Sequence, residues 1–231
     1  MHNALTGGLA QLGLRTDAAP RLAEFADAVL ERNRVMNLTA ITDPAEFAAL
    51  HLLDSAALLT VADFRGKTVV DVGTGAGFPG VPLRIIEPDF DLTLLDSLGK
   101  RIDFLQEVCE RLELRRVETI HARAEDFAAA RREQYDIAVS RAVASLNVLC
   151  ELALPLVKVG GCFLAMKSVS SDDEIDGALC AIGQLGGQIR RIRDYTVPGT
   201  DVTHRVIVID KIHPTPSAYP RTFARIKKRP L

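Results

Sequence analysis

The residues best suited to chemistry stand together in one glycine-rich stretch, Asp71-Val72-Gly73-Thr74-Gly75-Ala76-Gly77. This stretch follows an apolar run at 68–72 that predicts a buried strand. Ligands of alternating strand and helix sheets bind beyond the carboxyl ends of the strands, where the backbone turns tightly and comes close to the ligand. Glycine permits that approach because it has no Cβ. The stretch therefore predicts a binding loop for a cofactor that contains a nucleoside.

Two cofactor classes fit such a loop. A G-x-G-x-x-G pattern, typical of dinucleotide-binding proteins, runs from Gly75 to Gly80, but this motif alone is weak, and Pro79 removes a backbone N–H where pyrophosphate would bind. In the other frame, Asp71 stands two residues ahead of the alternating glycines. S-adenosylmethionine has no phosphate and carries an ammonium group and a sulfonium cation, so a carboxylate there suits it and repels pyrophosphate. The pattern favours S-adenosylmethionine, with a nicotinamide or flavin dinucleotide as the alternative.

Two later positions fit a nucleoside that lies across the same edge. Asp96 ends the next predicted strand, roughly 20 residues after the glycines, where an acid commonly holds the ribose hydroxyls in either cofactor class. After a third predicted strand, the backbone of Ala124 and the side chain of Glu125 are placed to meet the adenine edge. The alternative is that Glu125 and Asp126 only favour the start of a helix.

The exit of the fourth strand, Val139-Ser140-Arg141-Ala142, bears on the methyl acceptor. It contains neither the Asn/Asp-Pro-Pro-aromatic loop used for amino groups of adenine and cytosine nor a cysteine nucleophile. An arginine suits an acceptor whose attacking atom already has a free lone pair and which presents oxygens to be held, as guanine does with N7 and O6. Arg141 is therefore predicted to be catalytic and to contact the cofactor. The alternative is a buried ion pair within the sheet.

The elements that must position these residues alternate along the chain. From Lys67 onward, short apolar runs rich in β-branched residues alternate with helical patterns, which predicts a doubly wound, mostly parallel α/β sheet. Strands are expected at 68–72, 91–96, 117–121, 135–140 and 162–167. A helix near 173–185 precedes two extended stretches, which are expected to pair as an antiparallel hairpin at the sheet edge, at 188–197 and 205–209.

The first part of the chain predicts helices. Apolar residues recur at helical spacing after Pro20, and a second helix is expected after Asp43, which can cap it, with Pro44 in the first turn and Glu46 completing a capping box. We therefore expect an N-terminal helical extension, residues 1–65, packed on a methyltransferase domain, residues 66–231.

Bulk properties narrow the class of protein. The 231 residues, 48% of them hydrophobic, suffice for one domain with a substantial core. No apolar run approaches the roughly 18 to 20 residues of a membrane helix, and the start lacks the layout of a secretory signal, so a cytoplasmic protein is expected. No heptad pattern or large apolar stripe calls for a dimer, so a monomer is expected.

Metal binding and global attraction to nucleic acid are not predicted. The four cysteines lie far apart and form no ligand set with the five histidines, so they are expected to be reduced thiols in the core. The net charge of -2 and the pI near 6.2 offer no overall attraction for RNA, so any RNA binding must depend on local clusters of charge.

Several short stretches form a specific combination. They are the glycine loop continued through Phe78-Pro79-Gly80-Val81-Pro82-Leu83, then Asn37-Leu38-Thr39-Ala40-Ile41, His51-Leu52-Leu53-Asp54-Ser55, Leu95-Asp96-Ser97 with Lys100-Arg101, Ala124-Glu125, Ser140-Arg141-Ala142, and Gly160-Gly161 leading to Lys167. Together they resemble, over nearly the whole chain, the bacterial 16S ribosomal RNA guanine-N7 methyltransferases, the small-subunit methyltransferase G family, formerly glucose-inhibited division protein B. The resemblance implies a class I fold and methyl transfer from S-adenosylmethionine to N7 of a specific guanine in 16S ribosomal RNA of the small subunit.

The resemblance also implies roles for individual residues. Cofactor contacts are implied at Gly73, Phe78, Ala124-Glu125 and Arg141, with Asp96 on the ribose. On the sequence alone, Phe78 is instead a helix-packing aromatic residue. RNA contacts are implied for Asn37 and for His51, although a lone histidine is commonly a helix-surface or capping residue. The family further suggests a basic surface around the acceptor pocket, for which the candidates are Lys100, Arg101, Arg123 and Lys167.

The C-terminal segment is basic. From His204 to Leu231, seven lysines and arginines stand against one acid, Asp210, and such a tail can contact phosphates while the overall charge stays negative. Arg221 is the named candidate in it. The family commonly follows Tyr-Pro-Arg with a glycine-containing loop, whereas here Thr222-Phe223-Ala224-Arg225 follows Tyr219-Pro220-Arg221. This departure leaves the path of the tail open.

Three other functions stay open on the sequence. One is a class I methyltransferase that acts on another RNA. A second is a nicotinamide-dependent oxidoreductase, for which Ser140 and Tyr195 are too isolated to form a hydride-transfer site. The third is a ribosome-associated factor that kept the fold without turnover.

Overall fold

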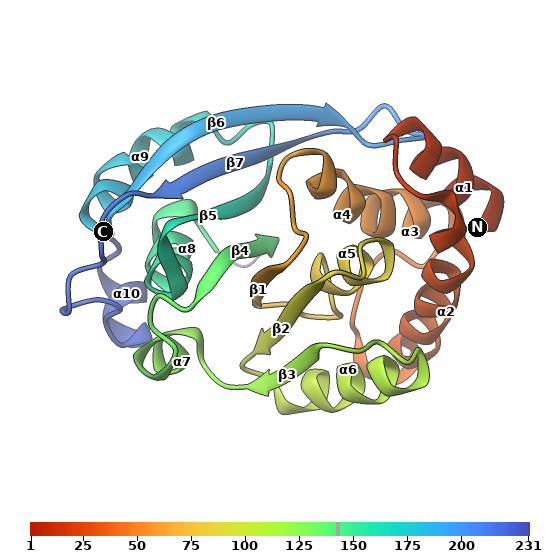
Figure 1. Cartoon of the computed structure of the whole chain (residues 1–231), viewed down its shortest axis with the longest axis horizontal. Helices are drawn as coiled ribbons and strands as arrows, with labels where there is room; N and C mark the ends of the chain where they lie inside the picture. Colours follow the sequence, from red (N-terminus) through yellow and green to blue (C-terminus); the bar gives the residue numbers. More distant parts are fainter. Residues whose placement is uncertain (142–143) are drawn as a thin grey trace.

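The computed structural model describes residues 1–141 and 144–231, and a seven-stranded sheet runs through it with helices on both faces (Figure 1). The strand order is β3-β2-β1-β4-β5-β7-β6. The strands are β1 Lys67–Val72, β2 Phe90–Asp96, β3 Val117–His121, β4 Tyr135–Arg141, β5 Val157–Ser168, β6 Gly187–Thr196 and β7 Thr203–Lys211. The first five pair in parallel, and β7 lies antiparallel to both β5 and β6.

The helices fill the predicted intervals between strands. Those of the core are α5 Gly80–Ile86, α6 Gly99–Arg111, α7 Ala124–Ala130, α8 Leu146–Ala153, α9 Asp172–Gln184 and α10 Phe223–Lys228, with a 3-10 turn, η4, at Leu154–Leu156. The expected doubly wound sheet and its antiparallel edge hairpin are therefore confirmed. None of the helices in the described residues is long and apolar enough to cross a membrane.

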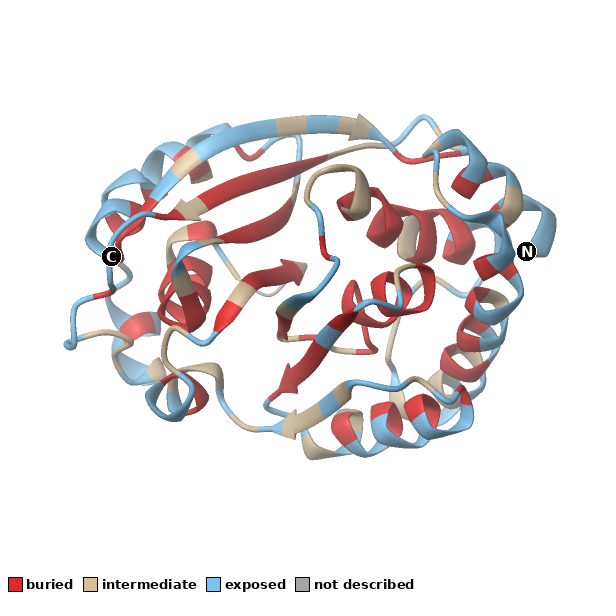
Figure 2. Ribbon diagram, in the orientation of Figure 1, coloured by how far each residue is buried: buried red, intermediate tan, exposed pale blue. Residues whose placement is uncertain are grey.

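Alternation along the strands divides the core into two layers. Val69 and Leu94 point into the layer that faces the N-terminal helices, α5 and α6, while their neighbours Val70 and Leu95 point into the layer beneath α7, α8 and α9. Figure 2 shows the central strands buried and β6, at the edge, largely exposed. The expected start of β5 was five residues too late. The residues from Lys158 to Gly161 show no apolar alternation that would indicate a strand.

Residues ahead of the sheet form helices, among them the one predicted after Pro20 and the one predicted after Asp43. They are α1 His2–Gln11, η1 Thr16–Ala18 and α2 Ala19–Met36, followed by a continuous helical run of α3 Pro44–Phe47, η2 Ala48–Leu53, α4 Asp54–Ala56 and η3 Ala57–Thr60. Asp43 caps this run as expected, since its carboxylate accepts hydrogen bonds from the backbone N–H groups of Ala45 (2.9 Å) and Glu46 (3.0 Å). These helices share one core with the sheet, and the division near residue 65 stays a prediction.

Two local features depart from the regular pattern. The segment η2 is π-helical, a rare conformation that is frequent at functional sites. Of the four cysteines, three are buried as predicted, whereas Cys180 is exposed on α9, so the prediction of a core thiol is wrong for that one. Burial raises the pKa of the Cys109 thiol to about 12, which keeps that thiol protonated.

Candidate active site

The glycine loop links the end of β1 to the start of α5. Gly73 (φ +72°) and Gly75 (φ +61°) both take the left-handed conformation that favours glycine. The N–H of Gly75 donates to Asp96 Oδ2 at the end of β2 (2.9 Å). A Cβ built on Gly75 would meet nothing closer than a backbone oxygen at 4.0 Å, so this part of the loop is open to a ligand. Gly77 differs, because its Cβ would lie 2.8 Å from Val81 Cγ2.

Asp71 fixes the loop from below. One carboxylate oxygen, Oδ2, accepts hydrogen bonds from the Thr74 hydroxyl (2.7 Å) and from the N–H of Gly80 (2.8 Å). The other oxygen is buried and has no partner among the described residues. Burial raises the pKa of Asp71 to about 7, against the opposing effect of the Thr74 and Gly80 hydrogen bonds. Asp71 therefore joins the end of β1 to the start of α5.

A cavity of about 380 Å³ opens over this loop, within the size range of small-molecule sites. It extends from the end of β2 across the loop to the end of β4, and the N-terminal segment forms one wall. The lining residues are Leu38, Thr39, His51, Gly73, Thr74, Gly75, Ala76, Phe78, Asp96, Ser97, Arg101 and Arg141.

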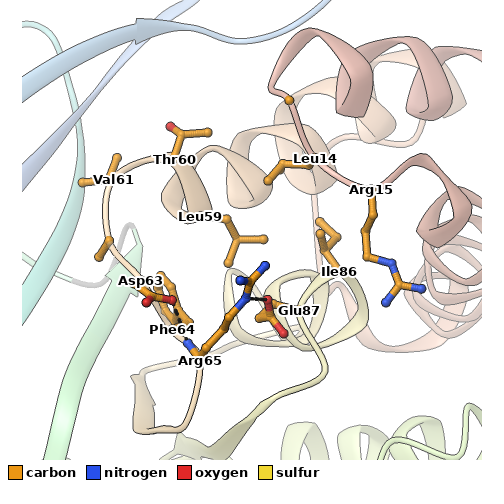
Figure 3. A pocket seen from close by; sticks show the side chains of 12 residues that line it. Leu14, Arg15, Leu59, Thr60, Val61, Asp63, Phe64, Arg65, Ile86 and Glu87 are labelled. Atoms are coloured by element: carbon orange, nitrogen blue, oxygen red, sulfur yellow. Dashed lines mark hydrogen bonds and ion pairs between the residues drawn. The ribbon is translucent and has the colours of Figure 1, made fainter.

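A second cavity, of about 390 Å³, lies beside the amino ends of β1 and β2 (Figure 3). Its walls are the chain from Leu59 to Arg65, the end of α5 and the residues that follow α1. Two of the charged side chains there pair with each other, since Arg65 Nε lies 2.9 Å from Glu87 Oε2. None of the predicted site residues lines it.

Arg141 is held rigidly in the wall at the end of β4. Its Nη1 donates to the carbonyl of Leu50 and to Asp54 Oδ2, both at 3.0 Å, and Nη2 lies 3.0 Å from His51 Nδ1. The guanidinium carbon lies 4.9 Å from the centre of the Phe78 ring. The π-helical segment thus supplies a carbonyl and a side chain to the arginine. The ion pair weighed as the alternative for Arg141 is present; the arginine also lines the cavity, and its role in catalysis and cofactor binding stays a prediction.

Asp54, only 1% exposed, ties this wall to the C-terminal hairpin. Its second oxygen accepts hydrogen bonds from the Tyr195 hydroxyl and from His204 Nδ1, both at 2.7 Å. Burial by itself would raise the pKa of Asp54, but the hydrogen bond from His204 and the charge of Arg141 outweigh it, so this pKa lies below its ordinary value. The bond to Asp54 in turn raises the pKa of His204.

His51 forms part of the cavity wall. Its ring stacks on Phe78 with a centroid distance of 4.7 Å, and Phe47 meets it edge-on at 4.9 Å. Burial, together with the positive charge of Arg141, lowers the pKa of His51 to about 4, so the ring is neutral at physiological pH. Its Nε2 lies 2.7 Å from Thr39 Oγ1. The interpretation as a helix-surface or capping histidine is therefore wrong.

Comparison with known proteins agrees with this geometry. A family model described as "rRNA small subunit methyltransferase G" matches residues 18–192. The chain belongs to this family.

Two curated relatives carry the family's name, and the match covers most of their length. The ribosomal RNA small subunit methyltransferase G of Clostridium perfringens (strain SM101) is 46% identical over 210 residues, which cover 90% of this chain and 88% of that protein. Its counterpart in Alkaliphilus metalliredigens is 45% identical over 232 residues, which cover 98% and 97%. The expected family and methyltransferase activity are thus confirmed.

Solved structures share the fold at low sequence identity. TrmN from Thermus thermophilus matches with a TM-score of 0.54 and 22% identity, covering 68% of this chain and 48% of that one. M. jannaschii TYW2, in complex with AdoMet, matches with a TM-score of 0.53 and 15% identity, covering 64% and 71%. The class I fold is confirmed. S-adenosylmethionine is the methyl donor of the family to which the chain belongs, as expected.

The residues that line the cavity suit S-adenosylmethionine. The open backbone at Gly75 allows close approach, and Asp96 places a carboxylate where ribose hydroxyls would bind. Arg101 and Arg141 bring positive charge to a ligand that carries an amino-acid carboxylate. Phe78 packs against Phe25 and also lines the cavity, so the packing role and the cofactor role are compatible.

Some predicted cofactor residues lie outside this lining. Asp71 and Gly77 shape the loop from beneath, and we expect them to affect the cofactor through the loop. Ala124 and Glu125 begin α7 beside the cavity, where the N–H of Ala122 donates to the carbonyl of Asp96 (3.2 Å). Their contact with adenine stays a prediction. Ala142, from the fourth-strand motif, lies outside the described residues.

Five of the seven predicted RNA-binding residues divide into two groups. His51 and Arg101 line the cavity, and Asn37, Lys100 and Arg123 are exposed outside it. Asn37 ends α2 in the left-handed conformation (φ 50°).

The RNA-binding role predicted for Lys167 and Arg221 must be corrected. Lys167 is 10% exposed and lies 2.6 Å from Glu174 Oε1, and Arg221 pairs with the fully buried Glu151 at 2.6 Å. Both charges are neutralised inside the fold, so we expect them to anchor loops and not to bind phosphates.

Several cavity and support residues were missed by the sequence interpretation. Thr39 belongs to a quoted stretch but drew no attention as a single residue. Asp54 stands three positions after His51 in a helical segment, a spacing that places two side chains near each other. Tyr195 and His204 lie 141 and 150 positions from Asp54, and no local pattern joins them to it. Among the described residues, no three His, Cys, Asp or Glu side chains gather in a way that could hold a metal ion.

Proposed function

We propose that this methyltransferase transfers a methyl group from S-adenosylmethionine to N7 of a guanine in 16S ribosomal RNA of the small subunit. The family gives the ribosomal RNA of the small subunit as its substrate. The observation that supports N7 is that the described residues lining the cavity offer no free general base. S-adenosylmethionine, when bound, supplies an electrophilic methyl group.

The two candidate bases in the wall are already committed. Nδ1 of neutral His51 faces the Arg141 guanidinium, which can only donate, so its lone pair is used. Asp96 accepts backbone N–H groups from Gly75 and from Leu98 at 2.9 Å each and pairs with Arg101, and we expect its remaining capacity to hold the ribose hydroxyls. An acceptor that had to lose a proton would therefore find no help here. Guanine N7 carries a free lone pair and needs none.

Arg141 retains hydrogen-bonding capacity for the acceptor. Of the five N–H groups of an arginine, three donate to Leu50, Asp54 and His51, which leaves two for ligand oxygens. The ion pair with Asp54 fixes the guanidinium before any ligand binds. Catalysis by positioning and by electrostatic stabilisation is then what the wall can supply.

Exposed cations at the start of α7 and on α10 suit an RNA backbone. Arg123 follows β3 at the carboxyl edge of the sheet, and its guanidinium lies 5.3 Å from the Phe223 ring of α10. On α10 itself, Lys227 and Lys228 are exposed and form no ion pair within the described residues, while Ile226 is fully buried and anchors the helix. The divergent tail thus packs against Arg123 at the start of α7, and its exposed charges support phosphate contacts.

The direct test supplies labelled S-adenosylmethionine to the purified protein with 16S RNA, or with small-subunit particles that lack the modification. We expect label on RNA and cleavage at one guanine under N7-specific chemistry. Label on protein or on a small metabolite, or no label, would reject the proposal.

A substitution separates the role of Arg141 from general RNA affinity. Arg141→Ala should lower the single-turnover rate more than it lowers RNA affinity, because the side chain lies in the cavity wall. Arg190→Ala is the matched control, since Arg190 lies on the exposed edge strand β6 and pairs with Asp210 of β7. Loss of RNA affinity with an unchanged single-turnover rate would contradict this role. A monomer in the cytoplasm stays a prediction, which sedimentation and cell fractionation can check.

A further inference from the structure

Thr39 lies in the cavity wall, and three neighbouring residues fix its position by hydrogen bonds. Asn33 holds its backbone on both sides, because Asn33 Oδ1 accepts the Thr39 N–H (2.9 Å) and Asn33 Nδ2 donates to the Thr39 carbonyl (3.0 Å). The Thr39 Oγ1 accepts the N–H of Ile41 (3.0 Å) and lies 2.7 Å from His51 Nε2. The hydroxyl therefore sits at a fixed place in the wall.

Arg141 decides where the proton of His51 lies. A guanidinium has N–H donors and no acceptor, so the imidazole nitrogen that faces it, Nδ1, must be the one without a proton. The neutral ring then carries its proton on Nε2 and donates it to Thr39 Oγ1. The low pKa of His51 agrees with a neutral ring.

This leaves the Thr39 hydroxyl with one function. A hydroxyl oxygen has two lone pairs and one hydrogen. Both lone pairs are occupied, by the N–H of Ile41 and by His51. The hydrogen has no acceptor among the described residues. It is therefore a hydrogen-bond donor that can face the cavity.

We propose that Thr39 donates a hydrogen bond to an acceptor oxygen of the ligands in the cavity, and that the chain Asp54–Arg141–His51 holds it in that direction. This deepens the proposed function and rests on it for the identity of the ligands. Two oxygens qualify, one on the carboxylate of the methyl donor and the other O6 of the target guanine. Adenine presents an amino group where guanine has O6, so a fixed donor there would disfavour adenine.

The first test is the position of the His51 proton, which nitrogen-15 NMR of histidine-labelled protein measures without any variant of Thr39. The resonances are assigned by their absence in His51→Gln. We expect a proton on Nε2 and none on Nδ1 at neutral pH. A proton on Nδ1 would make Thr39 the donor to His51, and protons on both nitrogens would exclude the contact with Arg141. Either result overturns the proposal.

The second test distinguishes the two oxygens. Calorimetry compares the affinities for S-adenosylhomocysteine, which has the carboxylate, and for 5′-methylthioadenosine, which lacks the amino-acid part. If the carboxylate is the acceptor, Thr39→Val weakens S-adenosylhomocysteine by about tenfold or more and leaves methylthioadenosine unchanged. If guanine O6 is the acceptor, the affinities for both nucleosides remain at their wild-type values and the single-turnover rate with RNA falls by about tenfold. Thr39→Ser should restore whichever value fell.

The matched control is Thr42→Val, because Thr42 is exposed three positions away and outside the lining. It should leave both affinities and the rate unchanged. Equal weakening of both nucleosides by Thr39→Val, or wild-type affinity together with a wild-type rate, overturns the proposal. If the protein methylates no RNA, the proposed function fails, whereas the NMR result and the nucleoside affinities still decide the role of Thr39.

Discussion

Removal of the Asp54 carboxylate should destabilise the protein more than the loss of an ordinary surface ion pair. Asp54 is 1% exposed and receives hydrogen bonds from Arg141, Tyr195 and His204. Asp54→Ala would leave the Arg141 side chain, only 16% exposed, without a counter-ion, and the two donors Tyr195 and His204 would lose their acceptor.

The expected cost follows from the burial of the pair. Breaking a buried ion pair by removing one partner costs about 3–5 kcal/mol, because an uncompensated charge stays behind. That is a large part of a total stability of about 5–15 kcal/mol. Asp210→Ala is the control, because Asp210 and Arg190 are 34% and 55% exposed and such pairs contribute about 0–1 kcal/mol.

Urea denaturation followed by circular dichroism measures both variants. Asp54→Ala should move the midpoint strongly downward at an unchanged slope with denaturant, and Asp210→Ala should leave it near the wild-type value. Asp54→Asn, which keeps one carbonyl oxygen as an acceptor, should fall between them. If Asp54→Ala costs no more than the control, the cluster does not hold the wall as we infer.

Three further perturbations test other parts of the structure. The hydrogen bond to the buried Asp54 carboxylate raises the pKa of His204 above 6.5, so the stabilisation by protonated His204 is complete below pH 6.5 and is lost as the pH rises through the raised pKa. His204→Gln should flatten that part of the plot of stability against pH, and an unchanged plot would contradict this. Gly77→Ala should cost about 1–3 kcal/mol in urea denaturation, because of its φ of +100° and its close contacts, whereas Gly7→Ala in the exposed interior of α1 should stabilise by about 0.5–1 kcal/mol; equal effects would refute the packing argument. Lys227→Gln with Lys228→Gln should lower the slope of log RNA affinity against log salt by about 2 and leave S-adenosylhomocysteine binding intact, and a constant slope would exclude phosphate contacts by α10.

Most of the fold could be predicted because its signals are local. Buried parallel strands appear as apolar runs, and helices between them as apolar faces at helical spacing. The start of β5 was missed because Lys158, Gly160 and Gly161 interrupt the apolar run there, and the apolar residue among them, Val159, is exposed. The order of β6 and β7 in the sheet follows from pairing between distant segments, which no local pattern shows.

The site could be predicted only in its contiguous part. The glycine loop and Asp96 stand at fixed positions relative to strand ends, so the sequence alone brings them together. Arg141 was identified by type, but its support by Asp54 depends on packing between the N-terminal helices and the sheet. Lys167 and Arg221 were misjudged because charge alone does not reveal a partner elsewhere in the fold, and Glu151 is such a partner.

The hairpin of β6 and β7 has a consequence for synthesis. Tyr195 and His204 close over Asp54, which was translated about 140 residues earlier, and β7 inserts between β5 and β6 to complete the sheet. A chain still growing on the ribosome therefore holds the glycine loop and Arg141 well before the carboxylate that orients Arg141 is enclosed. We expect the nascent chain to stay inactive until about residue 204 has emerged.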